Sequence, residues 1–332
     1  MVENSRQALV GAIGGTFISL AIADIDELSI GNFALLNSAD FRSPMEAIER
    51  YLKSLPRCPD KVGLSVAGHV EPERAKMNHL PWSFDWNDIR AVTGAQHVHF
   101  VNEFEALALA APLLSDYDTI DIGKGKPQLH GNRAMVSAGT GLGAAVAIWN
   151  GDSWRALSGE SRFASFPPTR KGEYDIAGLL APDGFLSVGQ VLTGRGLMAL
   201  HAALAKKHKQ PEAKLTPAQI TKAGLSGEDP AAGEALDLMA TWLGRFAGDI
   251  ALHYGATGGV YLAGGLPSNI IPALQTGRFR DAFEGEGDRH AYLGHIPVKV
   301  LKTGADAGLR GAAVALANSL PVRSTPLRRL KA

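Results

Sequence analysis

Three glycine-containing turns are the first residues in this sequence whose types and spacing could do chemistry. They are Gly14-Gly15-Thr16, the run Gly139-Thr140-Gly141-Leu142-Gly143, and the pair Gly264-Gly265. Glycine lets backbone N–H groups approach a phosphate, and a threonine hydroxyl adds a donor, so such turns can cradle anions. A tight hairpin needs glycine with or without a ligand, and for any one turn this structural interpretation is favoured. The three together are a candidate phosphate site.

A carboxylate in Asn102-Glu103-Phe104 is the second candidate. Glu103 could act as a general base toward a hydroxyl group. The same residues are explained by helix capping, because Asn102 is a good N-cap and Glu105 occupies the capping-box position. Taken alone, these residues favour the capping interpretation.

The elements that must position these residues form a mixed α/β pattern. The sequence predicts strands at 8–13, 18–23, 61–68, 97–101 and 258–263, and helices at 43–55, 102–114, 193–208 and 233–255. Residues 207–219 read as a polar loop, and 319–332 as a basic tail. The first two strands would form a hairpin around the first glycine turn.

The opening stretch is repeated within the chain. Residues 8–24 match residues 134–150 at a constant offset of 126, and the matches include Ala8 with Ala134 and Gly15 with Gly141. Such self-similarity favours a duplicated domain, although shared hairpin composition could also produce it.

Composition excludes several classes of protein. The chain has 332 residues, 45% of them hydrophobic, and its 33 Lys and Arg balance its 33 Asp and Glu. This predicts a folded chain of two domains without an electrostatic field for nucleic acid. The uncharged stretch 250–277 contains glycines and prolines that argue against a membrane span. A single cysteine, Cys58, fits a reducing compartment, so we expect a cytoplasmic protein.

The ordered set of motifs resembles the bacterial glucokinase family of the hexokinase and actin-like superfamily. It runs from Gly-Gly-Thr through "VNEFEALALA", "SAGTGLGAA" and "SGES" to "GGVYLAGGLPSN", over roughly residues 7–316. The resemblance implies two actin-like (ribonuclease H-like) α/β domains flanking a cleft. The small domain would be 1–113 plus about 300–318, and the large domain 114–299. It also implies a homodimer and a role in glycolysis.

The resemblance further implies a site for ATP, Mg²⁺ and a sugar. The first phosphate loop would be Gly14, Gly15 and Thr16, and the second would be Gly139, Thr140, Gly141 and Gly143. Gly264 and Gly265 would approach the adenosine. Glu103 would be the catalytic base, and Asn102, Glu103, Glu160 and Gln190 would bind the sugar.

Five positions depart from the pattern of the family. They are Ala12 in place of the magnesium-side aspartate, Phe17 for asparagine, Glu103 for aspartate, Phe163 for histidine and Gln190 for glutamate. Arg162 is also new, as either a group that recognises a negative charge or a solvated surface arginine. Alanine cannot hold a hydrated magnesium ion, and no metal ligand is predicted.

The sequence is compatible with three functions. An active kinase that phosphorylates glucose comes first, with a kinase for another sugar or sugar acid as an alternative. The third possibility is a catalytically impaired protein that binds sugar or has a regulatory role.

Four residues, three histidines and a tryptophan, are further candidates for the site. His97 and His99 would face the same side of one strand as a possible metal pair, but ordinary packing is favoured because no third ligand is apparent. His79 and Trp82 are candidates for lining the cleft that the resemblance implies.

Overall fold

A computed structural model describes residues 6–182, 184–211, 213–302 and 304–320. These residues divide into two compact units, one from Met1–Ala106 together with Gly308–Ala332 and the other from Leu107–Ala307. Both divisions fall inside helices, α3 (Glu103–Ala110) and α13 (Gly304–Ser319). The chain therefore passes from one unit to the other, and back, through helical segments.

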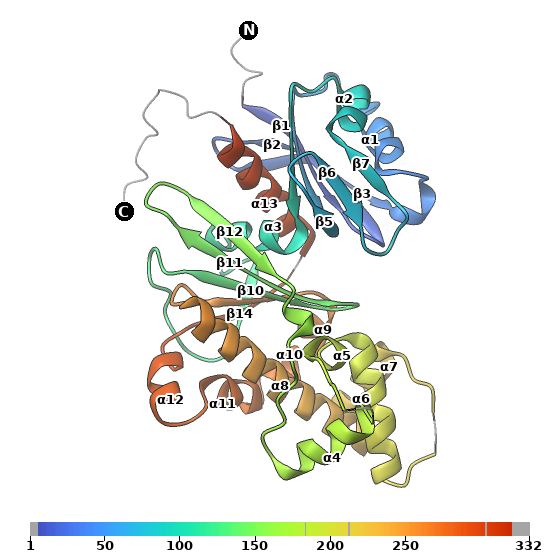
Figure 1. Ribbon diagram of the computed structural model, residues 1–332, viewed down its shortest axis with the longest axis vertical. Coiled ribbons are helices and arrows are strands. Elements are labelled where there is room, and N and C mark those ends of the chain that lie inside the picture. The colour runs from blue at the N-terminus through green and yellow to red at the C-terminus, as the bar shows by residue number, and fades with distance from the viewer. Residues whose placement is uncertain (1–5, 183, 212, 303, 321–332) are drawn as a thin grey trace. The chain divides into compact units, whose positions relative to one another are not determined.

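The first unit contains a five-stranded sheet in the order β3-β2-β1-β4-β8 and a small sheet in the order β5-β6-β7 (Figure 1). Its strands are β1 (Gln7–Ile13), β2 (Phe17–Asp24), β3 (Ser29–Asn37), β4 (Lys61–Val66), β5 (Gly68–Val70), β6 (Arg74–Met77), β7 (Ser83–Asp85) and β8 (His97–Asn102). Its helices, besides parts of α3 and α13, are α1 (Pro44–Leu52) and α2 (Trp86–Thr93).

The predicted first hairpin is confirmed. β1 pairs antiparallel with β2, with Ile13 opposite Ile18, and parallel with β4. Nearly all of β1 is buried, as a strand between two neighbours covered on both faces requires. The predicted helix 43–55 corresponds to α1. Ser43 is its N-cap, and the Ser43 side chain accepts a hydrogen bond from the Glu46 backbone N–H.

Helix α13 packs backbone against backbone in the first unit. A Cβ at Gly311 would lie 1.7 Å from the Ala106 carbonyl oxygen, and one at Gly63 would lie 2.9 Å from the Ala312 carbonyl oxygen. No side chain fits at Gly311, so this glycine permits the close approach of α13 to α3.

The second unit contains a six-stranded sheet in the order β12-β11-β10-β13-β14-β9. Its strands are β9 (Thr119–Asp121), β10 (Arg133–Ala138), β11 (Leu142–Trp149), β12 (Trp154–Gly159), β13 (Val260–Ala263) and β14 (Val298–Leu301). Its further helices are α4 (Lys171–Leu180), α5 (Val188–Val191), α6 (Gly194–Lys207), α7 (Pro217–Ser226), α8 (Pro230–Tyr254), α9 (Gly265–Asn269), α10 (Ile271–Leu274), α11 (Arg278–Glu284) and α12 (Gly287–Leu293).

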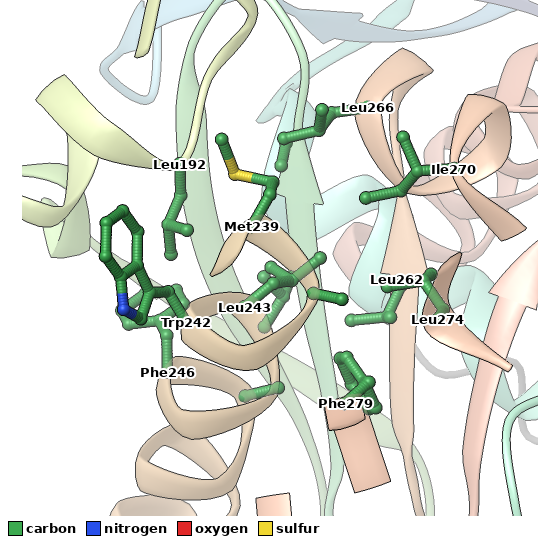
Figure 2. Close-up of a cluster of buried hydrophobic side chains, with 14 of the residues drawn as sticks. Leu192, Met239, Trp242, Leu243, Phe246, Leu262, Leu266, Ile270, Leu274 and Phe279 are labelled. Carbon is green, nitrogen blue, oxygen red and sulfur yellow. The ribbon is translucent and has the colours of Figure 1, made fainter. Parts of the chain in front are cut away.

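Helix α8 organises the core of the second unit. Asp229 caps its start by accepting from the Ala232 backbone, and Gly255 ends it in the left-handed conformation. Figure 2 shows side chains from α8, including Trp242, packed with residues of β13 and the helices that follow it. The predicted loop 207–219 ends earlier than expected, because Thr216 and Gln219 form a capping box that starts α7.

The two main sheets repeat one topology, which supports the predicted duplication. In each, three antiparallel strands lead to two parallel ones, β3-β2-β1-β4-β8 in the first unit and β12-β11-β10-β13-β14 in the second. The two hairpins do not pair with registers related by the constant offset of 126 residues, because their loops differ in length. Ile13 and Ile18 close a loop of residues 14–17, whereas Ala138 and Leu142 close the shorter loop 139–141.

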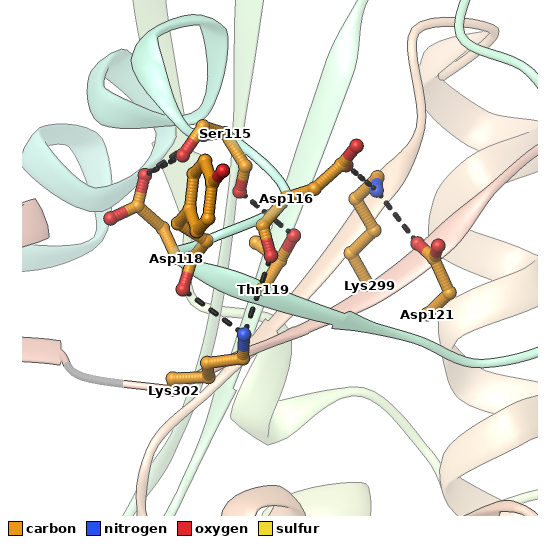
Figure 3. Close-up of polar contacts among 8 residues, drawn as sticks. Ser115, Asp116, Asp118, Thr119, Asp121, Lys299 and Lys302 are labelled. Carbon is orange, nitrogen blue, oxygen red and sulfur yellow. Dashed lines mark hydrogen bonds and ion pairs between the residues drawn. The ribbon is translucent and has the colours of Figure 1, made fainter.

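A polar network fixes the edge strand β9 (Figure 3). Lys299 Nζ lies 2.9 Å from Asp116 and 2.7 Å from Asp121, and Lys302 Nζ donates to the Asp116 and Tyr117 carbonyl oxygens. Burial lowers the pKa of Lys299, but the two carboxylates outweigh it and raise the pKa. Lys299 and Asp121 are also directly opposite each other in the pairing of β14 with β9, so their ion pair joins the two strands.

Candidate active site

The first glycine turn is held by hydrogen bonds within its own unit. The Gly14 N–H donates to the Phe17 carbonyl (3.0 Å), and the Ser38 hydroxyl donates to the Gly14 carbonyl (2.9 Å). Gly15 and Thr16 are exposed, and Phe17 is 51% exposed. The turn therefore presents a backbone segment and a hydroxyl to a ligand, with an apolar ring beside them.

Ala12 occupies β1 just before this turn. A Cβ at Gly308 would lie 3.3 Å from the Ala12 Cβ, so position 12 faces the first turns of α13. Among the described residues, no group of three or more His, Cys, Asp or Glu could hold a metal ion. Alanine at position 12 itself offers no oxygen ligand to a magnesium ion.

The second and third glycine turns come together in the second unit. A Cβ at Gly139 would lie 3.6 Å from the Gly265 nitrogen, and one at Gly264 would lie 2.3 Å from the Ala138 carbonyl oxygen. Gly264 has φ 89°, which side-chain-bearing residues rarely adopt. Backbone from two segments far apart in the sequence thus lines one place, as a phosphate cradle requires.

The individual residues of the second turn differ in their surroundings. Thr140 and Gly141 are exposed at its tip, where the Gly139 N–H donates to the Gly141 carbonyl (2.8 Å). Gly143 lies inside β11, is buried and pairs with Ser137. Its backbone groups face a strand partner, so the tip of the turn is Gly139 to Gly141.

Helix α6 begins at this cradle, which the residues around it in the sequence do not indicate. The Gly194 N–H donates to the Gly139 carbonyl (2.8 Å), and Thr193 caps α6 by accepting from the Gly196 backbone. Thr193 before a glycine-rich helix start was a signal for the cap, but not for its location.

Asn102 and Glu103 mark the passage from β8 to α3 in the first unit. Asn102 Oδ1 accepts from the Phe104 N–H (2.9 Å), and its Nδ2 donates to the Gly68 carbonyl (3.0 Å). The capping interpretation of Asn102 is confirmed. Glu103 is half-buried, and burial raises its pKa. A raised pKa makes its carboxylate a stronger base.

Glu160 and Gln190 lie in the second unit. Glu160 is exposed and precedes the 3-10 turn Ser161–Phe163. Gln190 Oε1 accepts from the Ser187 N–H (2.7 Å), which completes a capping box at the start of α5. The sugar-binding residues that the resemblance implies also include Asn102 and Glu103 of the first unit, so this set stays a prediction.

A cavity of about 470 Å³ lies between α8 and the segment after Glu160. Its wall includes Phe166, Trp242 and Arg245, and none of the described lining residues is a predicted site residue. Arg245 forms a two-point ion pair with Glu173, at 2.9 and 3.0 Å. Burial raises the pKa of Glu173, but hydrogen bonds from Arg245 and Thr169 outweigh it and lower the pKa to about 2.

The histidine candidates fall in different surroundings. His97 is exposed and His99 is half-buried, with its pKa lowered by burial. His79 is exposed, and its Cβ lies 3.5 Å from where a Cβ at Gly15 would be. Trp82 is only 7% exposed and belongs to the hydrophobic core of the first unit.

No helix among the described residues has the length and apolar character that a membrane crossing needs.

Comparison with known proteins shows the family to which the chain belongs. The family model described as Glucokinase matches residues 9–319. The chain belongs to the glucokinase family. A glucokinase of Tolumonas auensis is 31% identical over 317 residues, which cover 95% of this chain and 98% of that protein. One of Brucella melitensis is 37% identical over 296 residues, with coverages of 88% and 86%.

Solved structures agree with this membership. A glucokinase from an Antarctic psychrotroph has a TM-score of 0.85 at 30% identity, covering 95% of this chain and 99% of that one. A ROK family glucokinase from Streptomyces griseus, in complex with glucose and AMPPNP, has a TM-score of 0.64 at 19% identity, with coverages of 94% and 99%, and shares the fold. The predicted actin-like α/β fold is confirmed.

Membership makes the chain a sugar kinase, an enzyme that transfers a phosphoryl group to an alcohol. The family implies use of ATP and, typically, of a divalent metal. The comparisons favour this activity over a non-catalytic sugar-binding role.

Proposed function

We propose that this enzyme transfers the γ-phosphoryl group of ATP to glucose and forms glucose 6-phosphate. The observation that carries the proposal is the half-buried carboxylate of Glu103, which has a raised pKa and stands at the start of α3. Glu103 would accept the proton of the 6-hydroxyl while that oxygen attacks the γ-phosphorus. The bond from this phosphorus to the β–γ bridging oxygen breaks, and ADP leaves.

The remaining site residues have roles in binding. Gly139 and Gly141, with Thr140 at the exposed tip and Gly143 behind it, would hold the ATP phosphates. Gly264 and Gly265 would approach the adenosine. The contact of Gly139 with Gly265 supports this part of the proposal.

The first unit would add its own phosphate loop, Gly14, Gly15 and Thr16. Asn102 would contact the sugar from the same unit, and Glu160 and Gln190 would contact it from the second. The proposal therefore requires that the two units, as small and large domains, face each other across a cleft. Magnesium would enter it with the phosphates of ATP, and Ala12 would contribute no ligand to it.

A turnover assay tests the proposal. Purified protein with ATP and Mg²⁺ is expected to phosphorylate glucose in a panel of hexoses and sugar acids, measured as ADP formed. Glu103→Gln should lower kcat at least about a hundredfold, the size of a general-base effect. Glu105→Gln is the matched control, since it makes the same change in the same helical turn.

The other outcomes separate the alternatives. Turnover of a sugar acid in place of glucose would identify a different kinase. Sugar binding without turnover across the panel would support a regulatory protein, and absence of both would remove the proposal. The implied homodimer is tested by sedimentation of the purified chain.

A further inference from the structure

Three parallel strands of the first unit end at the same level. Ile13 of β1 is directly opposite Val66 of β4, and Val66 is directly opposite Asn102 of β8. Gly14 and Glu103, the residues that follow β1 and β8, therefore leave the sheet at one edge. Open α/β sheets bind their ligands at the carboxyl ends of their strands. Within this unit, the first glycine turn and Glu103 share such an edge.

A loop of residues 78–81 is tied to the same edge. Ala67 follows β4, and its N–H donates to the last carbonyl of β1 (3.0 Å) while its carbonyl accepts from the Asn78 N–H (3.2 Å). The Met77 N–H donates to the Trp82 carbonyl (3.0 Å), which closes the loop. Met77 and Trp82 are both buried in the core of the unit. The loop is therefore anchored at both ends beside the first glycine turn.

His79 is the residue of this loop that meets the turn. Its Cβ lies 3.5 Å from where a Cβ at Gly15 would be. His79 is exposed, and its ring forms no hydrogen bond or ion pair with the described part of the chain. An imidazole ring has at least one N–H in either protonation state, so it always offers a donor. His79 thus presents an accessible donor beside the turn proposed to hold phosphate.

The other side chains around this turn offer little to a phosphoryl group. Ala12 and Phe17 flank it and carry no polar atom, and Thr16 supplies one hydroxyl. Phosphoryl transfer depends on donors and positive charge placed around the transferred group. At this edge of the sheet, His79 is the only side chain that can carry a positive charge, over residues 12–17, 66–68, 78–81 and 102–104.

We propose that His79 is a further catalytic residue, whose ring N–H donates a hydrogen bond to an oxygen of the γ-phosphoryl group during its transfer from ATP to the sugar. The donor offsets negative charge on the phosphoryl oxygens in the transition state. Glu103 takes the proton of the sugar hydroxyl, and His79 neither gains nor loses one. This inference rests on the proposed phosphorylation of glucose and adds a residue that contacts the transferred group.

Two substitutions and a matched control test this role. His79→Ala removes the donor, and His79→Gln keeps an N–H donor in a side-chain amide. In His79→Ala, kcat/KM for ATP should fall about tenfold to a hundredfold, the range for a lost hydrogen bond to a charged group, while KM for glucose changes less than about threefold. His79→Gln should recover part of the loss. His97→Ala, at an exposed histidine at the other end of β8 from Asn102, should leave both constants unchanged.

Calorimetric titration locates the contact on the nucleotide without turnover. AMPPNP carries a γ-phosphoryl group, and ADP has none. AMPPNP should bind His79→Ala at least about fivefold more weakly than it binds the wild type, whereas ADP should bind both proteins equally. The midpoints of denaturant unfolding should agree for His79→Ala and His97→Ala, because both side chains are exposed.

The failures of the two proposals are distinguishable. An unchanged kcat/KM for ATP in His79→Ala, with glucose still phosphorylated, would make His79 a surface histidine and overturn the inference alone. Equal losses of affinity for ADP and AMPPNP, or a His79→Ala variant clearly less stable than His97→Ala, would also overturn it. Absence of phosphorylation by the wild-type protein would overturn the proposed function, while the two nucleotide titrations would still decide whether His79 contacts the γ-phosphoryl group.

Discussion

Replacing Glu103 by glutamine is expected to have opposite effects on activity and on stability. Glutamine has nearly the same shape but cannot accept the proton of the sugar hydroxyl. A loss of at least about a hundredfold in kcat corresponds to about 2.7 kcal/mol of activation free energy. Burial raises the pKa of Glu103 above 4.5, the ordinary pKa of a glutamate. As the solution is acidified, kcat/KM of the wild-type enzyme should therefore begin to fall at a pH above 4.5.

The stability effect follows from the same burial. The folded protein holds the Glu103 proton at a higher pH than the unfolded chain does. The free energy of unfolding therefore falls as pH rises through the interval between the pKa of Glu103 in the unfolded chain and its higher pKa in the folded protein. It stays lower above the interval, by about 1.4 kcal/mol for each unit of difference in pKa. Glutamine has no charge to desolvate. Glu103→Gln should therefore be more stable than the wild type at pH 7, and the difference should shrink below pH 4.5.

Denaturant unfolding at pH 7 and pH 4, together with the turnover assay, measures both effects. Glu105→Gln should leave kcat within about threefold, since only Glu103 has the proposed role. A Glu103→Gln variant with wild-type turnover would refute the role as base. A variant that is inactive and also less stable at pH 7 would show that Glu103 serves the structure instead.

Three further predictions concern the cradle, the buried ion pair and the metal. Gly264→Ala should lower the free energy of unfolding by more than about 1 kcal/mol, because Gly264 has a positive φ and the new Cβ would meet Ala138. Gly141→Ala, where no described atom lies within 4 Å of the new Cβ, should leave the free energy of unfolding unchanged and raise KM for ATP. Equal stabilities of the two variants would refute this contrast. Glu173→Gln should lower the free energy of unfolding at pH 7 by about 3–5 kcal/mol, measured by denaturant unfolding. Between pH 4.5 and 2 the wild type should lose stability, and the variant should lose less. The same pH dependence in both proteins would contradict this prediction. Ala12→Asp should lower the Mg²⁺ concentration for half-maximal turnover, and an unchanged magnesium titration would contradict the assignment of position 12.

Local patterns in the sequence were sufficient for the main elements of the fold. The first hairpin could be predicted because two apolar runs flank Gly14 and Gly15, and both runs are buried. The start of α3 could be predicted because Asn102 offers a cap that the structure uses. These features depend on neighbours in the chain, which the sequence displays directly.

Contacts between distant segments could not be predicted in the same way. Nothing near Gly139 in the sequence points to Gly265, which lies beside it in the structure. The place of Gly143 inside β11 depends on where strand pairing resumes after the turn, which glycine content does not fix. The capping role of Gln190 could have been predicted from the sequence, because Ser187 lies three residues earlier and the two residues form a capping-box signature.

The packing of α13 on the first unit has a consequence for synthesis of the chain. Leu316 is buried with Ala8 and Ile25, so residues from the two ends of the polypeptide share one cluster. About 200 residues separate Ala106 from Gly308, and a ribosome needs about 10–40 s to add them. During that interval the amino-terminal sheet has emerged without the helix that covers it, so a nascent chain halted before α13 would expose the surface that chaperones bind.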